Sequence, residues 1–518
     1  MKLNNKIILS IPLVLMLAGY CFAGTGSGEF KIGWIANDVE GNESVNHSTY
    51  NVHDGFNLSL ERFRYNFDNG LRARADLRQI SLKNRNLSAG ITKSGLFGIN
   101  LHNHQFRQFY DFDGDSYTRR NKAGADLWVT PIQYIKLFLG GSLIDFSGKT
   151  ENFLEADIPA APEDRDYTQT DFKFGTRVLH EGRMIRAEYR SAKYKDDTDA
   201  SRDQDRRDFR LSAITPVPEY DWIVLSGLYR SFSTEYTDTK FGINSTTASS
   251  GARVSLPNNF TVSYKIWFNR AGSDSNLVDT DNLVNSIYIT HTWPGNAGIT
   301  AGYQNDQNDD FDDQLKANSY FFSGWLKPIP ALEFKGKLGI RSEEINDGAR
   351  LIGDEDRTRF KISGKYRHRD KCAMSFYVES KNRKNDQIGS ETEFIRFGPN
   401  MTGKCKDFVF CTWGYSYSKG KFTNSEQEFE FQDHNIHIDM DVPDYKKASA
   451  GIGFHYYRGK RDLNTESFRL RFKGGYKVLD DYRLEAVYTV HNFDDLLVTD
   501  RYYTSNIVEI SLIRKLAF

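Results

Sequence analysis

Residues 332–341, with the sequence LEFKGKLGIR, alternate strictly between two kinds of side chain. The even positions are apolar or glycine, and the odd positions are charged apart from one glycine. Successive side chains of a β-strand point to opposite faces, so this alternation places an apolar row on one face and a charged row on the other. A helix would scatter the charges around its surface. The stretch therefore predicts a two-faced β-strand.

The same period of two recurs along the whole chain. It is clear in residues 71–77, 261–269, 359–367 and 468–476. We count roughly 26 such strands, with a range of about 22 to 26 and uncertain ends. They run from 29–36, through 56–66 and 71–83, to 502–518. The sequence predicts an all-β protein in which strand and connection together repeat through the chain.

Composition excludes several other classes of protein. The 518 residues include 41 Gly, 37 Phe and 28 Tyr but only 12 Pro, which favours strands joined by polar loops. The 68 Lys and Arg nearly balance the 69 Asp and Glu, so no basic excess points to nucleic acid. Beyond the N-terminus, no apolar run approaches the roughly 18 residues that a membrane-spanning helix needs. A helical membrane protein is excluded.

The N-terminus has the pattern of a cleavable export signal. Lys2 and Lys6 precede an apolar stretch at 7–19, and Cys21-Phe22-Ala23 supplies small residues for cleavage. A membrane anchor would need a longer apolar stretch, and Tyr20 disfavours lipid attachment at Cys21. The expected domains are a signal peptide at 1–23 and a single barrel at 24–518.

Strands of this kind fit two architectures. In a soluble sandwich the charged face meets water; in an outer-membrane β-barrel the apolar face meets lipid and the charged face lines the lumen. Segment length, aromatic residues near segment ends and alternating connection lengths favour the barrel. The expected short turns are Phe67–Gly70, Thr130–Pro131, Pro216–Glu219, Pro257–Asn259, Pro294–Asn296, Pro328–Pro330, His368–Asp370, Pro443–Lys446 and Leu479–Asp481; the expected long loops are 148–166, 195–205, 271–281, 305–314, 343–356 and 493–502.

The last segment supports export to the outer membrane of a Gram-negative cell. Phe518 is a terminal aromatic on an alternating strand, as in the signal that the barrel insertion machinery recognises. Val508, Ile510 and Leu512 share its face, while Arg514 interrupts that face. A C-terminal strand that runs inward places both mature termini in the periplasm and the long loops outside.

In a barrel, the charged positions of the alternating segments would line the lumen. This wall carries both signs of charge and therefore suits a polar partner. The candidate lining residues are Arg72, Arg74, Asp76, Arg78, Arg186, Glu188, Arg190, Lys265, Glu333, Lys335, Lys337, Arg359, Lys361, Arg469, Arg471 and Lys473.

Candidate metal ligands are few. Asp306, Asn308 and Asp310 resemble the start of a calcium loop, but the sixth position lacks Gly and Ala317 replaces the bidentate Glu. A solvated outer loop is the main alternative to a surface calcium site there. Two further polar clusters lack metal-site spacing, and we interpret them as lumenal polar residues: His102 with His104, and His434 with His437, Asp439 and Asp441.

No cluster indicates catalysis or covalent haem attachment. The chain has no phosphate-binding loop, nucleophile elbow or paired-carboxylate motif, so we expect that it is not an enzyme. Cys372, Cys405 and Cys411 remain after signal cleavage; they allow at most one disulfide, and Cys405 and Cys411 look awkward to bridge within one strand. None belongs to a haem-attachment motif, so haem could come only with a partner.

The layout resembles the decahaem-associated outer-membrane proteins of the MtrB/PioB family. The shared features are the signal, the alternating strands, the charged lumen, the missing plug domain, Phe518, and segments such as 56–62 and 95–101. The chain is short for this family and lacks the Cys-x-x-Cys often found near the mature N-terminus. The resemblance implies a sheath for a multihaem c-type cytochrome, with periplasmic or surface cytochromes as partners. An ordinary porin for hydrophilic solutes and a soluble or surface-attached β protein are the alternatives.

Overall fold

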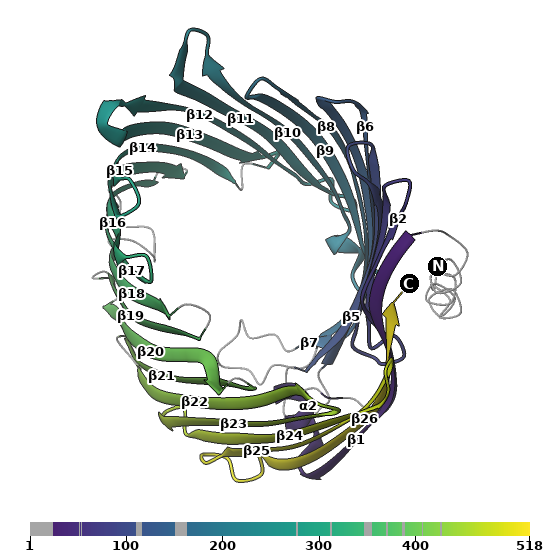
Figure 1. The fold of residues 1–518 in the computed structure, drawn as a ribbon. Helices are drawn as coiled ribbons and strands as arrows, with labels where there is room; N and C mark the ends of the chain where they lie inside the picture. Colours follow the sequence, from purple (N-terminus) through teal and green to yellow (C-terminus); the bar gives the residue numbers. More distant parts are fainter. Residues whose placement is uncertain are drawn as a thin grey trace.

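The computed structural model describes residues 24–517 apart from 51, 53, 110–116, 151–162, 276–277, 311–312, 346–354, 369–370, 386–388, 407 and 425–426. The expected signal peptide at 1–23 and the terminal Phe518 lie outside the described residues. The described chain forms one antiparallel sheet of 26 strands that closes into a ring (Figure 1). Each strand pairs with the next, and the last pairs with the first. The predicted large antiparallel β-barrel is confirmed.

The strands are much alike in length and follow one another directly. The described part includes one α-helix and two short 3-10 helices, and none of its helices is long and apolar enough to cross a membrane. The strands are β1 (Gly24–Gly41), β2 (Gly55–Phe67), β3 (Leu71–Arg78), β4 (Arg85–Lys93), β5 (Phe97–Phe109), β6 (Tyr117–Ile132), β7 (Ile135–Thr150), β8 (Glu163–His180), β9 (Arg183–Asp196), β10 (Gln204–Val217), β11 (Tyr220–Tyr236), β12 (Gly242–Leu256), β13 (Phe260–Ser273), β14 (Asp279–Trp293), β15 (Ala297–Asp310), β16 (Asp313–Ile329), β17 (Leu332–Ile345), β18 (Glu355–His368), β19 (Cys372–Asn385), β20 (Ser390–Lys406), β21 (Val409–Thr423), β22 (Glu428–Tyr445), β23 (Ala448–Arg461), β24 (Thr465–Leu479), β25 (Tyr482–Asp495) and β26 (Tyr502–Ala517). The helices are α2 (Glu43–Thr49), η1 (Ala200–Arg202) and η2 (Pro257–Asn259).

The two ends of the barrel differ in their connections. At one end every connection has two or three residues, whereas at the other the connections reach thirteen residues at 42–54. The predicted alternation holds, but one long loop was wrong. The expected loop at 305–314 is mostly strand, because β15 continues to Asp310 and β16 begins at Asp313.

Several of the expected turns at prolines begin inside strands, and Thr130–Pro131 lies wholly within β6. β6, β16 and β22 continue past Pro131, Pro328 and Pro443, and the turns follow at 133–134, 330–331 and 446–447. The pairing register shifts at each of these prolines. A β-bulge can accommodate a residue that lacks a backbone N–H, so proline marks the bulge and not the turn.

The helix α2 identifies the inner face of the wall, because it lies inside the ring in Figure 1. Its Thr49 Oγ1 is 2.7 Å from the hydroxyl of Tyr503 on β26, so Tyr503 points inward. Residues directly opposite each other on neighbouring strands share a face. The inner row therefore continues from Ser505, two residues after Tyr503, through the residues facing it strand by strand: His491, Arg469, His455, His437, Gly414, Asn400, Ser375, Lys365 and Glu333.

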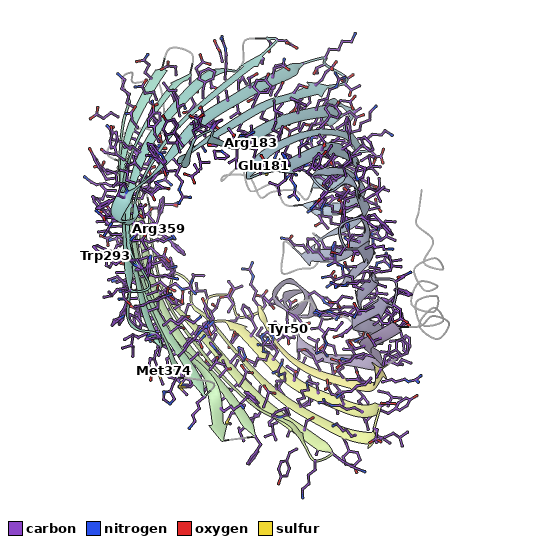
Figure 2. The ribbon with its side chains drawn as sticks, turned by 45° about the horizontal axis from the view of Figure 1, so that its top comes forward. Tyr50, Glu181, Arg183, Trp293, Arg359 and Met374 are labelled. Atoms are coloured by element: carbon purple, nitrogen blue, oxygen red, sulfur yellow. The ribbon has the colours of Figure 1, made fainter. Side chains whose placement is uncertain are left out.

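The outer face carries the large apolar side chains. Ile340, Phe360 and Trp293 are exposed there, Trp293 to 49%. Figure 2 shows Trp293 and Met374 on the outer side of the wall and Tyr50 and Arg359 on the lumen side. A soluble protein rarely exposes so continuous an apolar surface, whereas lipid requires one. This belt argues against the soluble alternative.

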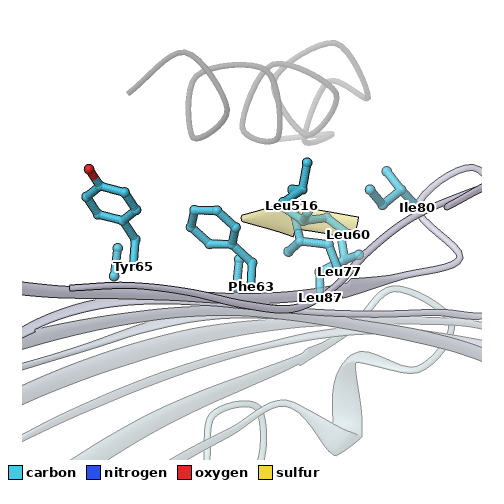
Figure 3. Close-up of a cluster of buried hydrophobic side chains, with 9 residues drawn as sticks. Leu60, Phe63, Tyr65, Leu77, Ile80, Leu87 and Leu516 are labelled. Atoms are coloured by element: carbon cyan, nitrogen blue, oxygen red, sulfur yellow. The ribbon is translucent and has the colours of Figure 1, made fainter. Parts of the chain in front are cut away.

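The apolar belt continues across the seam where the barrel closes. Figure 3 shows Leu60, Phe63 and Leu77 of β2 and β3 beside Leu516 of β26, in one apolar cluster. Further along β26, Val508, Ile510 and Leu512 are exposed on the outer face. Arg514 shares that face, and its guanidinium lies 5.5 Å from the centre of the Tyr482 ring. The expected alternation of the last strand is therefore present.

Candidate lumenal site

The candidate lining residues lie on the inner face by the register argument above. Lys335 and Lys337 share the parity of Glu333, and Arg359 and Lys361 face β17 from β18. Continuing the register around the closed sheet places the remaining candidates on the same face: Arg72, Arg74, Asp76, Arg78, Arg186, Glu188, Arg190, Lys265, Arg469, Arg471 and Lys473.

Ion pairs between neighbouring strands organise this wall. On β10, Asp208 is only 7% exposed and accepts hydrogen bonds from Arg210 at 2.7 Å and from Arg230 of β11 at 2.9 Å. On β8, Asp171 pairs with Arg190 of β9 at 2.9 Å. Each carboxylate thus links guanidinium groups around it. Such partly exposed pairs contribute at most about 1 kcal/mol each, so they mainly fix side-chain positions.

A second network lies on β15–β19. Arg341 of β17 bridges Asp306 of β15 and Glu343. Glu355 is 1% exposed and lies between Arg357 and Arg383, the latter at 2.5 Å. A further pair joins Arg359 Nη2 to Glu379 Oε1 at 2.7 Å. Asp306, Glu343, Glu355 and Glu379 thus each contact an arginine, whereas Glu333 contacts Lys335.

A third network lies on β22–β25. Asp439 is 3.5 Å from Arg471 and 3.4 Å from His455. Glu485 is 3.2 Å from Lys473 and 3.1 Å from Arg483. Here the two signs of charge are closely matched.

The wall of β16–β19 carries both signs of charge, but in unequal numbers. On its inner face Lys and Arg clearly outnumber Glu. The cations are Lys327, Lys335, Lys337, Arg341, Arg357, Arg359, Lys361, Lys365, Arg367, Lys381 and Arg383, and the acids are Glu333, Glu343, Glu355 and Glu379. The whole chain has a formal charge of only −1, so this excess is local.

Residues 42–50, which include α2, contact the inner face of the wall, and the sequence analysis did not predict this segment. Gly41 has a φ of 99° at the end of β1, and Asn42 then caps α2 by accepting from Val45 N at 3.0 Å. The Tyr503 hydroxyl contacts Thr49 Oγ1 and also His491 Nδ1, at 2.8 Å. The Asn-Glu start at 42–43 was the available signal.

The expected calcium ligands occupy a different position from the one predicted. Asp306, Asn308 and Asp310 lie on the inner face of β15, not in an outer loop. Asp306 is engaged by Arg341 and by Gln304, at 2.8 Å. Within the described ranges, no group of three or more His, Cys, Asp or Glu side chains could hold a metal ion.

The histidine clusters are divided between the two faces. His102 and His104 face the lumen with ring centres 5.8 Å apart, and His102 is 4.0 Å from Asp126. His437 also faces inward, beside His455, with Asp439 and Asp441 of the same strand. His434 belongs to the opposite face, where it contacts Tyr415 and Tyr417. The cluster expected around residues 434–441 is therefore not one site.

The cysteines lie near the short-turn end of the barrel. Cys411 is disulfide-bonded, and Cys372 has a free thiol. Cys405 and Cys411 belong to the two strands of the β20–β21 hairpin, so the expectation that they share one strand was wrong.

Comparison with solved structures identifies other large barrels. The siderophore receptor PirA from Pseudomonas aeruginosa matches with a TM-score of 0.51 and 10% identity, over 82% of this chain and 80% of that one. The FrpB iron transporter from Neisseria meningitidis matches with a TM-score of 0.50 and 11% identity, over 96% and 82%. The chain shares the large β-barrel fold of these two proteins. At such identity the likeness concerns the fold alone. The chain matches no known protein-family model, and no curated protein is significantly similar in sequence.

Proposed function

We propose that this chain is an outer-membrane barrel that encloses a multihaem c-type cytochrome, which carries electrons across the membrane. The observation that supports this role is the size of the ring. Porins of 16–18 strands already leave an aqueous channel, and this barrel has 26 strands. Inside it, the described residues place only the segment around α2.

An open lumen of this width would breach the permeability barrier of the cell, so a partner should fill it. The ion-paired inner wall suits a polar protein, because complementary charges fix the register of a partner. The cytochrome itself is inferred from the resemblance to the MtrB/PioB layout. In this role the chain is non-catalytic, and its contacts are with lipid outside and with the cytochrome inside.

Native purification tests the proposal. An affinity-tagged barrel, extracted in mild detergent, should co-purify with a protein that stains for haem. Deleting the barrel should leave that cytochrome unassembled and stop the reduction of extracellular acceptors. A haem-free preparation, from cells whose acceptor reduction survives the deletion, would rule the proposal out.

A solute channel is the second candidate, and the basic inner face of β16–β19 favours it. Such a face would attract anions and repel cations. If the chain is a solute channel, barrels purified from their native membrane should show a large, stable conductance in planar bilayers. A sheath that is filled by its partner would show little conductance in the same measurement.

A further inference from the structure

The inner wall is hollow at Gly339 on β17. This is an inward position between Lys337 and Arg341, and Phe321 of β16 and Arg359 of β18 face it on either side. A Cβ built on Gly339 would come no closer than 3.9 Å to its nearest neighbour, Phe321. Any larger side chain would project into the open space that the glycine leaves.

A recess of about 720 Å³ occupies this place. Pockets that hold small molecules commonly measure about 300–1,000 Å³. One side of the recess is aromatic, formed by Tyr288 and Phe321 with ring centres 6.2 Å apart. The other side is cationic, formed by Lys335, Lys337, Arg341, Arg357, Arg359 and Lys361. No carboxylate is among the described residues that line it.

Cations of the recess face each other in pairs across β17 and β18, so like charges are close together. Lys337 lies directly opposite Lys361, and Arg341 directly opposite Arg357. Like charges in this relation destabilise a sheet. The arginines have glutamate or aspartate partners, whereas Lys337 and Lys361 form no salt bridge with any described residue. Lys361 lies directly opposite Glu379, but Lys337 faces only Ser323 and Lys361 across the two neighbouring strands. A bound anion would supply the missing counter-charge.

We infer that this recess binds a small organic polyanion, with an apolar body against Phe321 and Tyr288 and carboxylate or phosphate groups toward the cations. Arg359 already donates from Nε and Nη2 to Glu379, so the two lysines offer the compact charges that such a group would meet first. Figure 2 shows Arg359 on the lumen side, where a solute could reach it. The inference does not depend on the cytochrome.

Calorimetric titration of the full-length barrel in detergent tests this site. The probe is benzene-1,3,5-tricarboxylate, which has an apolar ring and three carboxylates. We expect saturable binding by the wild type. The double variant Lys337→Gln/Lys361→Gln should bind at least about tenfold more weakly, because it removes the two lysines of the recess that form no salt bridge with a described residue. The absence of saturable binding by the wild type would overturn the inference.

Lys265→Gln is the matched control, because Lys265 is also a lumenal lysine but belongs to β13, outside the recess. Its affinity for the probe should equal that of the wild type, and an equal loss in both variants would indicate nonspecific attraction to the lumen.

Phe321→Leu tests the aromatic side of the recess. It should weaken the binding of the tricarboxylate more than the binding of citrate, which lacks a ring. A different outcome is that the double variant loses a co-purifying protein and that the probe binds neither to the wild type nor to the double variant. In that case the cations bind that protein, and the small-molecule site is excluded.

Discussion

At the scale of single residues, the face on which a side chain lies determines what a charge there costs. Leu338 lies on the outer face, opposite Phe322 and Phe360, whereas its neighbour Lys337 lies on the inner face. An Arg at the membrane midplane on the lipid face costs about 2–4 kcal/mol. Leu338→Arg should therefore reduce the fraction of barrel that folds into lipid vesicles, as measured by heat-modifiable migration. Lys337→Ala should fold almost normally, and equal losses from the two variants would contradict the assignment of faces.

Residue patterns in the sequence were sufficient to assign these faces but not the balance of charge on them. The alternation in 332–341 separates Leu338 from Lys337 without any tertiary information. Which cations would face each other depends on register between strands, and one residue of slip changes every pairing. The opposition of Lys337 and Lys361, and the hollow at Gly339, could therefore not be predicted from the sequence alone.

At the scale of elements, α2 depends on a few polar contacts with the wall. The Tyr503 hydroxyl, which is fully buried, contacts both Thr49 and His491. Tyr503→Phe removes these contacts, each with a net worth of about 1 kcal/mol. We expect the segment 42–54 to leave the wall more often and limited proteolysis to cut it roughly 5–30 times faster. The barrel itself should remain folded.

The adjacent Tyr502 provides the control for this experiment, because it belongs to the outer face and is 49% exposed. Tyr502→Phe should leave the proteolysis rate unchanged. Cleavage at the wild-type rate in Tyr503→Phe would mean that other contacts hold α2.

Element boundaries were predicted less well than element type, for a reason that concerns proline. Strands were recognisable from their period of two, and most short turns from Pro, Asn and Gly. A proline at a bulge and a proline at a turn have the same local sequence signal, since both lack a ladder hydrogen bond. Pro328 therefore suggested a turn two residues before the actual one. The acidic run at 305–314 suggested a loop because polarity on both faces hides the alternation of a strand.

At the scale of the whole molecule, the even strand count fixes which connections share a side. The turn at Pro294–Asn296 belongs to the short-connection end, and η1 belongs to the opposite end. With the short turns in the periplasm, Ser201→Cys should react with a membrane-impermeant maleimide on intact cells. Asn296→Cys should react only after the outer membrane is opened. Both variants need the Cys372→Ser background to remove the free thiol; labelling of Asn296→Cys on intact cells would reverse the orientation.

The uneven distribution of charge should also be measurable in the empty barrel. Lys and Arg predominate on the inner face of β16–β19 although the whole chain is nearly neutral, so the lumen should favour chloride over potassium. Screening lengths fall from about 10 Å at 0.1 M salt to about 3 Å at 1 M. Reversal potentials across a salt gradient in planar bilayers should therefore show anion selectivity at 0.1 M that is largely lost at 1 M. Lys337→Glu/Lys361→Glu should weaken this selectivity at low salt more than Lys265→Glu, because it reverses two charges in the sector where Lys and Arg predominate. Cation selectivity in the wild type would mean that the basic sector does not govern the path of ions through the lumen.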